Sequence, residues 1–327
     1  MTTTLLDHGD KLSCFTAALA TALEARGEAD WWRALLSEGP FLAVAPAGDH
    51  LRFEHHATAP LPALGLRITG SDDWDTAYAA LSEQISRHGV VVLLADYFNL
   101  PWQRAYKQLH GTHWLAIVDA GDGWLIEDPL DFATDLGPQS GSRVPVPDPS
   151  ALRSWAVGLG KHHPVSTLRE EAMAGTADIA ADSTYRWLAP AESTPGPGND
   201  NTHEPTPLPS SGRLSGSDAL LALAARYRFA RTAADFEQID DLWQALRQRE
   251  TLLWAAQQDR ELLDDAGLVH WERAVARWRA LPPLLLHARL RAANGGTVNT
   301  GLIAETLTEL ADFEGKHLAY AARAKGD

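Results

Sequence analysis

The chain of 327 residues contains one cysteine, Cys14, and two methionines. A single cysteine excludes an internal disulfide framework and fits a reducing compartment. The chain also lacks a cysteine cluster, a His-Glu-x-x-His motif and the glycine spacing of a dinucleotide or phosphate loop. We therefore expect no metal site and no tightly bound cofactor.

Basic residues and long apolar runs are also scarce. The chain has 28 Lys and Arg against 43 Asp and Glu, a net charge of −15, which argues against nucleic acid as a partner. The apolar run at residues 90–95 is too short to cross a membrane, and the first residues lack the pattern of a signal peptide. These features predict a cytoplasmic protein that binds neither nucleic acid nor membrane.

A segment rich in Pro, Gly and Ser, residues 190–216, divides the chain. We expect domains at 1–189 and 217–327, with 190–216 as the linker. Residues 1–216 carry 14 Lys and Arg against 27 Asp and Glu, whereas residues 217–327 carry 14 against 16. Both surfaces are interpreted first as solvated, although the acidic first part also suits a cationic substrate.

Apolar periodicity predicts an α+β N-terminal part and a helical C-terminal part. Strands are expected at 41–45, 64–68 and 90–95, a hairpin at 113–128, and helices at 15–26, 73–88, 218–231, 233–259, 268–278, 284–293 and 299–324. Four tryptophans on the C-terminal helices are expected in the core of a bundle: Trp243, Trp254, Trp271 and Trp278.

Cys14 lies where the first of these helices begins. The unpaired amides and the dipole of a helix start favour a thiolate over a thiol. The alternative is a structural role, because free cysteine is often a buried small hydrophobe. A catalytic role requires a base and a group that orients the base.

The predicted hairpin supplies both, in His113 and Asp128. With an even loop the two side chains share one face, directly opposite if Ala120-Gly121 is the turn and diagonal if Gly121-Asp122 is. Asp128 would then accept a hydrogen bond from Nδ1 of His113 and leave Nε2 for the thiol. Taken singly, His113 is better interpreted as an ordinary strand-edge histidine and Asp128 as a turn-starting aspartate before proline; the catalytic interpretation depends on both together with Cys14.

The order Cys14, His113, Asp128 resembles the bacteriocin-processing type of papain-like fold. The run from Val90 through Asp96-Tyr97-Phe-Asn-Leu-Pro to His110-Gly-Thr-His113 resembles the N-terminal domain of the butirosin biosynthesis protein H family, over residues 8–190. The resemblance implies a papain-like domain followed by a helical region. It also implies that Cys14 is the nucleophile, His113 the base and Asp128 its orienter, with Asp96, Tyr97 and His110 near the substrate.

Members of that family are cytoplasmic acyltransferases of natural-product pathways. The resemblance therefore implies transfer of an acyl group from an acyl carrier protein thioester, on its phosphopantetheine arm, through acyl-Cys14 to a small-molecule amine. The same three residues also permit thioester or peptide hydrolysis, or chain-releasing cyclisation, and a non-catalytic scaffold is a further alternative. No Gln precedes Cys14 to complete an oxyanion hole, which leaves the Cys14 N–H as the candidate donor, with His8 and Asp10 nearby.

Overall fold

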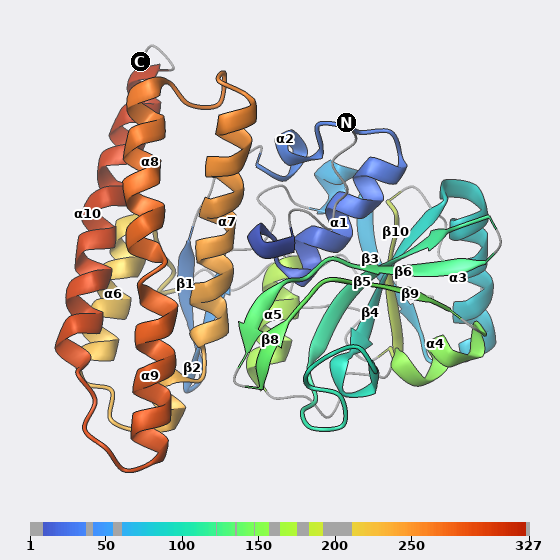
Figure 1. The fold of residues 1–327 in the computed structure, drawn as a ribbon, viewed down its shortest axis with the longest axis horizontal. Coiled ribbons are helices and arrows are strands. Elements are labelled where there is room, and N and C mark those ends of the chain that lie inside the picture. The colour runs from blue at the N-terminus through green and yellow to red at the C-terminus, as the bar shows by residue number, and fades with distance from the viewer. Residues whose placement is uncertain are drawn as a thin grey trace. The chain divides into compact units, whose positions relative to one another are not determined.

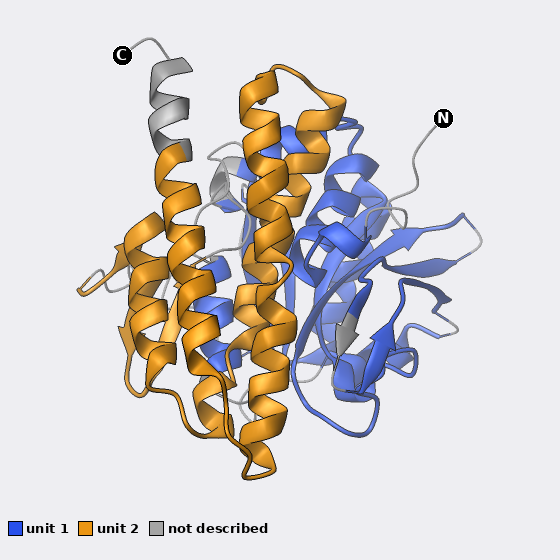
Figure 2. Cartoon of the chain, turned by 60° about the vertical axis from the view of Figure 1, so that its left-hand side comes forward, with its two compact units in different colours: residues 1–38, 56–209 blue, residues 39–55, 210–327 orange. Residues whose placement is uncertain are grey.

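The computed structural model describes residues 9–36, 42–54, 61–121, 123–134, 136–146, 148–156, 164–174, 183–191 and 211–324. The chain forms two compact units, drawn in different colours in Figure 2. Unit 1 contains residues 1–38 and 56–209, and unit 2 contains residues 39–55 and 210–327. Most of the expected linker, 192–210, lies outside the described residues.

Unit 1 is built on a six-stranded antiparallel sheet with the order β3-β10-β4-β5-β6-β9 (Figure 1). Its strands are β3 (Leu66–Ser71), β4 (Val90–Asp96), β5 (Thr112–Asp119), β6 (Trp124–Asp128), β9 (Ser142–Pro145) and β10 (Tyr185–Pro190). A separate hairpin joins β7 (Phe132–Thr134) to β8 (Gly137–Gln139). The expected β4 and the expected hairpin are present, whereas β7 to β10 have no counterpart in the sequence prediction.

The described part of unit 1 also contains helices, and local residues explain the two ends of α3. They are α1 (Cys14–Ala25), α2 (Trp31–Leu35), α3 (Trp74–His88), α4 (Ser150–Trp155) and α5 (Pro164–Ala174), with short 3₁₀ turns η2 (Leu61–Leu64) and η3 (Tyr97–Asn99). The carboxylate of Asp73 accepts the Thr76 N–H at 2.9 Å and caps the start of α3. Gly89 ends α3 at φ 72°, a left-handed conformation that favours glycine.

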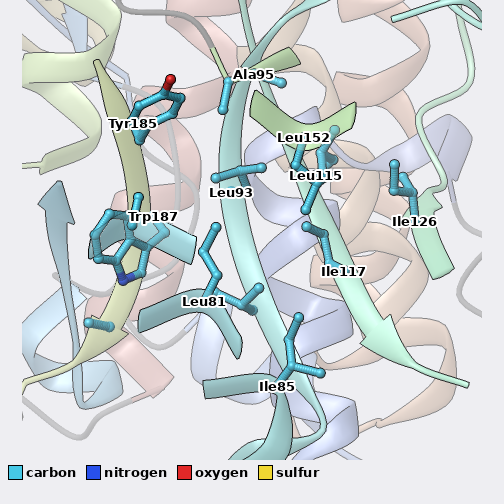
Figure 3. Packing of buried hydrophobic residues seen from close by; sticks show 14 of the residues in the cluster. Leu81, Ile85, Leu93, Ala95, Leu115, Ile117, Ile126, Leu152, Tyr185 and Trp187 are labelled. Atoms are coloured by element: carbon cyan, nitrogen blue, oxygen red, sulfur yellow. The ribbon is translucent and has the colours of Figure 1, made fainter. Parts of the chain in front are cut away.

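The two faces of the sheet are covered by different helices. On one face, residues of β4, β5, β6 and β10 pack with Ala77, Leu81 and Ile85 of α3, with Leu152 of α4 and with Ala156 directly after α4, as Figure 3 shows for most of this cluster. On the other face lies α1, whose Phe15 ring meets Trp114 edge-on at 5.4 Å. Because alternate residues of a strand face opposite sides of the sheet, neighbouring residues of β5 face different helices.

Unit 2 combines a helical bundle with a small sheet. The helices are α6 (Gly216–Arg228), α7 (Ile239–Gln258), α8 (Asp265–Trp278), α9 (Leu281–Ala293) and α10 (Thr300–Ala324), together with the 3₁₀ turn η4 (Ala233–Phe236). The sheet has the order β11-β1-β2, where β1 is Ala43–Ala47, β2 is His50–Glu54 and β11 is Leu214–Ser215. Unit 2 therefore includes residues 39–55, which the sequence division placed in the first domain.

The bundle core contains Trp271 and Trp278, as expected, whereas Trp243 and Trp254 are only half-buried. An ion pair also lies inside the bundle, because Arg249 donates to both carboxylate oxygens of Glu314 at 2.5 and 2.8 Å. In the part of the chain that the structure describes, no helix is long and apolar enough to cross a membrane.

Candidate active site

Cys14 is the first residue of α1, and its position is fixed by a capping box. Ser13 Oγ accepts the Thr16 N–H at 3.0 Å, and Thr16 Oγ1 accepts the Ser13 N–H at 2.8 Å. The thiol is neither fully buried nor fully exposed. The helix start thus presents a partly accessible thiol beside amides that carry partial positive charge.

The chain before α1 is anchored at the end of β6. Gly9 accepts the Asp131 N–H through its carbonyl at 3.2 Å, and a Cβ on Gly9 would collide with the Pro129 carbonyl oxygen. This close backbone approach requires glycine. It brings the segment leading to Cys14 against the residues that directly follow Asp128.

The strand register brings His113 and Asp128 together on one face. Asp119 pairs with Trp124, and the same register places Ala116 opposite Glu127. His113 and Asp128 are consequently diagonal neighbours, the arrangement predicted for a Gly121-Asp122 turn. Both are almost fully buried, at 3% and 1% exposure.

The imidazole ring of His113 is oriented opposite to the expectation from the sequence. Its Nε2 atom, rather than Nδ1, lies 2.9 Å from Oδ2 of Asp128. Cys14 lies close enough to the same ring to help raise the pKa of His113. Since Nε2 is occupied by the carboxylate, Nδ1 is the nitrogen left for the sulfur. The prediction that Nδ1 meets Asp128 was wrong, because strand parity determines the face but not the rotation of a ring.

Two residues that the sequence analysis missed also bind Asp128. Trp102 Nε1 donates to Oδ2 at 2.7 Å, and Gln103 Nε2 donates to the same oxygen at 2.6 Å. Gln103 Nε2 also lies 3.1 Å from Nε2 of His113. The other oxygen of Asp128, Oδ1, is buried without a hydrogen-bond partner among the described residues.

These contacts explain the charge state of the pair. Burial alone would lower the pKa of His113, but the charge and hydrogen bond of Asp128, with a further contribution from Cys14, raise this pKa to about 10. Burial would raise the pKa of Asp128, but His113, Trp102 and Gln103 together hold it below its usual value. At neutral pH the site therefore holds an imidazolium next to a carboxylate, and that imidazolium lies beside the thiol.

Asp96, Tyr97 and His110 lie together at the end of β4 and in the connection from β4 to β5. Asp96 Oδ1 accepts the N–H groups of Phe98 and Gly111 at 3.0 and 3.1 Å, and Oδ2 lies 2.6 Å from Nδ1 of His110. The Tyr97 ring packs where a Cβ on Gly111 would lie. Asp96 is 2% exposed, so its carboxylate organises the connection from within.

The structure describes only some of the residues that the sequence suggests as donors to an oxyanion. The Cys14 N–H is among the first amides of α1, which have no acceptor inside the helix. Asp10 is exposed and pairs with Lys11 at 2.7 Å, and a carboxylate offers no donor to an oxyanion. His8 lies outside the described residues.

Trp102 and Gln103 follow Leu100-Pro101 in a turn, where apolar periodicity carries no information. Their only signal in the sequence is their place within the run that resembles the acyltransferase family. Comparison of the chain with protein-family models and with curated proteins gives no match.

Proposed function

We propose that the protein is a cysteine-dependent acyltransferase with Cys14 as nucleophile, His113 as general acid and base, and Asp128 as orienter. The observation that carries the proposal is the buried His113–Asp128 pair, joined at 2.9 Å, whose histidine has its pKa raised in part by the one cysteine of the chain. A helix-borne thiol against an antiparallel sheet that carries the base is the arrangement of a papain-like domain. The acyl donor and amine acceptor follow from the sequence resemblance.

The raised pKa of His113 alters how the first step proceeds. With the ring of His113 already protonated, Cys14 reacts in this proposal as the thiolate, with the imidazolium as its counter-ion. The thiolate attacks the carbonyl carbon of the donor thioester and forms the new carbon–sulfur bond. The Cys14 N–H at the helix start is the available donor to the oxyanion.

Collapse of the tetrahedral intermediate breaks the bond to the donor sulfur. The departing thiolate takes the proton from Nδ1 of His113, which leaves acyl-Cys14 and a neutral ring. An amine then attacks the acyl group, and the neutral ring accepts the amine proton. Expulsion of the Cys14 thiolate restores the starting pair, so protons and bonds balance over the cycle.

The proposal is tested by intact-mass analysis after incubation with acyl-pantetheine thioesters. We expect one acyl adduct on the wild-type chain and none on Cys14→Ala. Adding a panel of primary amines and polyamines separates transfer from hydrolysis, since an acceptor accelerates loss of the adduct and yields the amide. Release of free acid at a rate that does not depend on amine would contradict transfer and favour a hydrolase.

A further inference from the structure

Gln103 occupies a position between the two charged groups of the site. Its side chain is 7% exposed, and its amide nitrogen lies 2.6 Å from Oδ2 of Asp128 and 3.1 Å from Nε2 of His113. The amide nitrogen and oxygen cannot exchange places, because the amide oxygen would then face a carboxylate oxygen at the same short distance. Gln103 is therefore a hydrogen-bond donor at this site.

A donor at this position has two possible acceptors, which lead to different states of the ring. If Nε2 of His113 carries a proton, both Nε2–H and the Gln103 N–H donate to Asp128. If Nε2 loses its proton, the Gln103 N–H can donate to the ring, and Nδ1–H then faces the sulfur of Cys14. A bond from N–H to a carboxylate is stronger than one to a neutral nitrogen, so an ionised Asp128 favours the first arrangement.

The turn that carries Gln103 is held from its other side by Gln139 of β8. Oε1 of Gln139 accepts the Arg104 N–H at 2.8 Å, and its Nε2 donates to the Trp102 carbonyl at 3.4 Å. Arg104 Nε also donates to the Pro138 carbonyl at 2.7 Å. Gln139 is 2% exposed, so a buried side chain brackets the backbone on both sides of Gln103. The amide is thus held in place rather than free to adjust.

We infer that Gln103 is a positioning residue, which keeps Asp128 ionised and Nε2 of His113 protonated so that Nδ1 remains directed at Cys14. The inference rests on the proposed function, because it assigns the residue that maintains the charge pair the mechanism uses. It predicts that Gln103 controls the pH range over which Cys14 reacts rapidly, and that Gln103 makes no contact with the acyl group.

The test is the rate at which iodoacetamide alkylates Cys14, the only cysteine, measured from pH 5 to pH 10. An ordinary thiol, with a pKa of about 8.5, is almost fully protonated at pH 6, so rapid alkylation at pH 6 reports the ion pair. Gln103→Met keeps the length of the side chain and removes the donor. We expect its rate at pH 6 to fall about tenfold or more, the effect of losing one hydrogen bond to a charged group, and its rate at pH 9.5 to match the wild type.

The matched control is Gln108→Met in the same connection, where the exposed amide donates to the Arg104 carbonyl at 3.0 Å. Its pH profile is expected to follow the wild type. If Gln103→Met also follows the wild type while His113→Ala loses reactivity at pH 6, the inference is overturned and the proposed function stands. If the wild type itself reacts as an ordinary thiol, both are overturned.

A measurement on the wild type alone covers the case in which Gln103→Met does not fold. Nitrogen chemical shifts of the histidine rings report which nitrogen carries the proton. We expect Nε2 of His113 to remain protonated from pH 5 to pH 9. A ring that carries its proton on Nδ1 alone at neutral pH would contradict the inference.

Discussion

His113 and Asp128 are joined through Nε2 and Oδ2 at 2.9 Å, inside unit 1 and almost completely shielded from solvent. A buried charge is costly unless it is paired and hydrogen-bonded. Asp128 meets this condition with three N–H donors on one oxygen, from His113, Trp102 and Gln103. The pair is therefore stable as ions within the fold.

Asp128→Asn is predicted to slow acyl transfer about 10- to 100-fold, the equivalent of losing one charge-assisted hydrogen bond. The amide does not supply the negative charge that keeps His113 protonated. Transfer rates measured against Asp119→Asn test this, because Asp119 lies at the far end of β5, where its side chain accepts the Gly121 N–H at 2.8 Å. Equal rates for the two variants would contradict the role of Asp128.

The stability of unit 1 is predicted to fall at alkaline pH. The pKa of His113 is raised from 6.5 to about 10 in the folded protein, so the folded state binds the proton more tightly than the unfolded state. The contribution is fully present below pH 6.5 and is lost as the pH rises through about 10. Denaturant unfolding at pH 6, 8 and 10 should show the decline in the wild type, and His113→Gln should lack this part of it.

A second buried group, Glu170 of α5, is predicted to make the stability of the protein depend on pH in a lower range. Burial raises its pKa from 4.5 to about 7, although Arg186, Thr112 and Trp114 act in the opposite direction. No hydrogen bond of good geometry reaches either of its carboxylate oxygens among the described residues. Because the folded state binds this proton more tightly, stability falls as the pH rises from 4.5 to about 7.

Glu170→Gln is therefore predicted to stabilise the protein at pH 8, by at most about 3 kcal/mol, since each pKa unit corresponds to about 1.4 kcal/mol. At pH 4.5 the variant should differ little from the wild type, because the glutamate is then protonated in the fold and resembles the amide. Thermal unfolding at the two pH values measures the difference. A variant less stable than the wild type at pH 8 would show that the charged form of Glu170 is favoured.

Gly9→Ala is predicted to reduce the reactivity of Cys14 without changing any group of the charge pair. The added methyl would meet the Pro129 carbonyl oxygen, so the segment before α1 must move away from the end of β6. Iodoacetamide alkylation at pH 6 should slow relative to Gly301→Ala, where a Cβ meets only Asn299 Oδ1, at an ordinary 3.5 Å. Unchanged reactivity in Gly9→Ala would show that this contact does not position the thiol.

The features that the sequence predicts are those set by local pattern. The start of α1 at Cys14, the buried strand β4 and the shared face of His113 and Asp128 follow from periodicity, capping and hairpin parity. Each depends on residues close together in the chain. The parity argument also anticipated the diagonal placement, because it considered both positions of the turn.

Other features depend on distant parts of the chain. Strand β10 inserts between β3 and β4, and β1 pairs with β11 through Ala43 and Ser215, and no local pattern encodes either pairing. Gln103 reaches Asp128 from a turn, and the His113 ring is rotated so that Nε2 meets the same carboxylate oxygen. These features depend on tertiary contacts that a few side chains make, and the periodicity of the sequence does not specify such contacts.

The most direct test of the account is the mass of the intact protein after reaction with an acyl-pantetheine thioester in the absence of any acceptor. The account predicts a single acyl adduct that peptide mapping places on Cys14, and no adduct on Cys14→Ala. Absence of an adduct on the wild type, or an adduct that persists on Cys14→Ala, would contradict it.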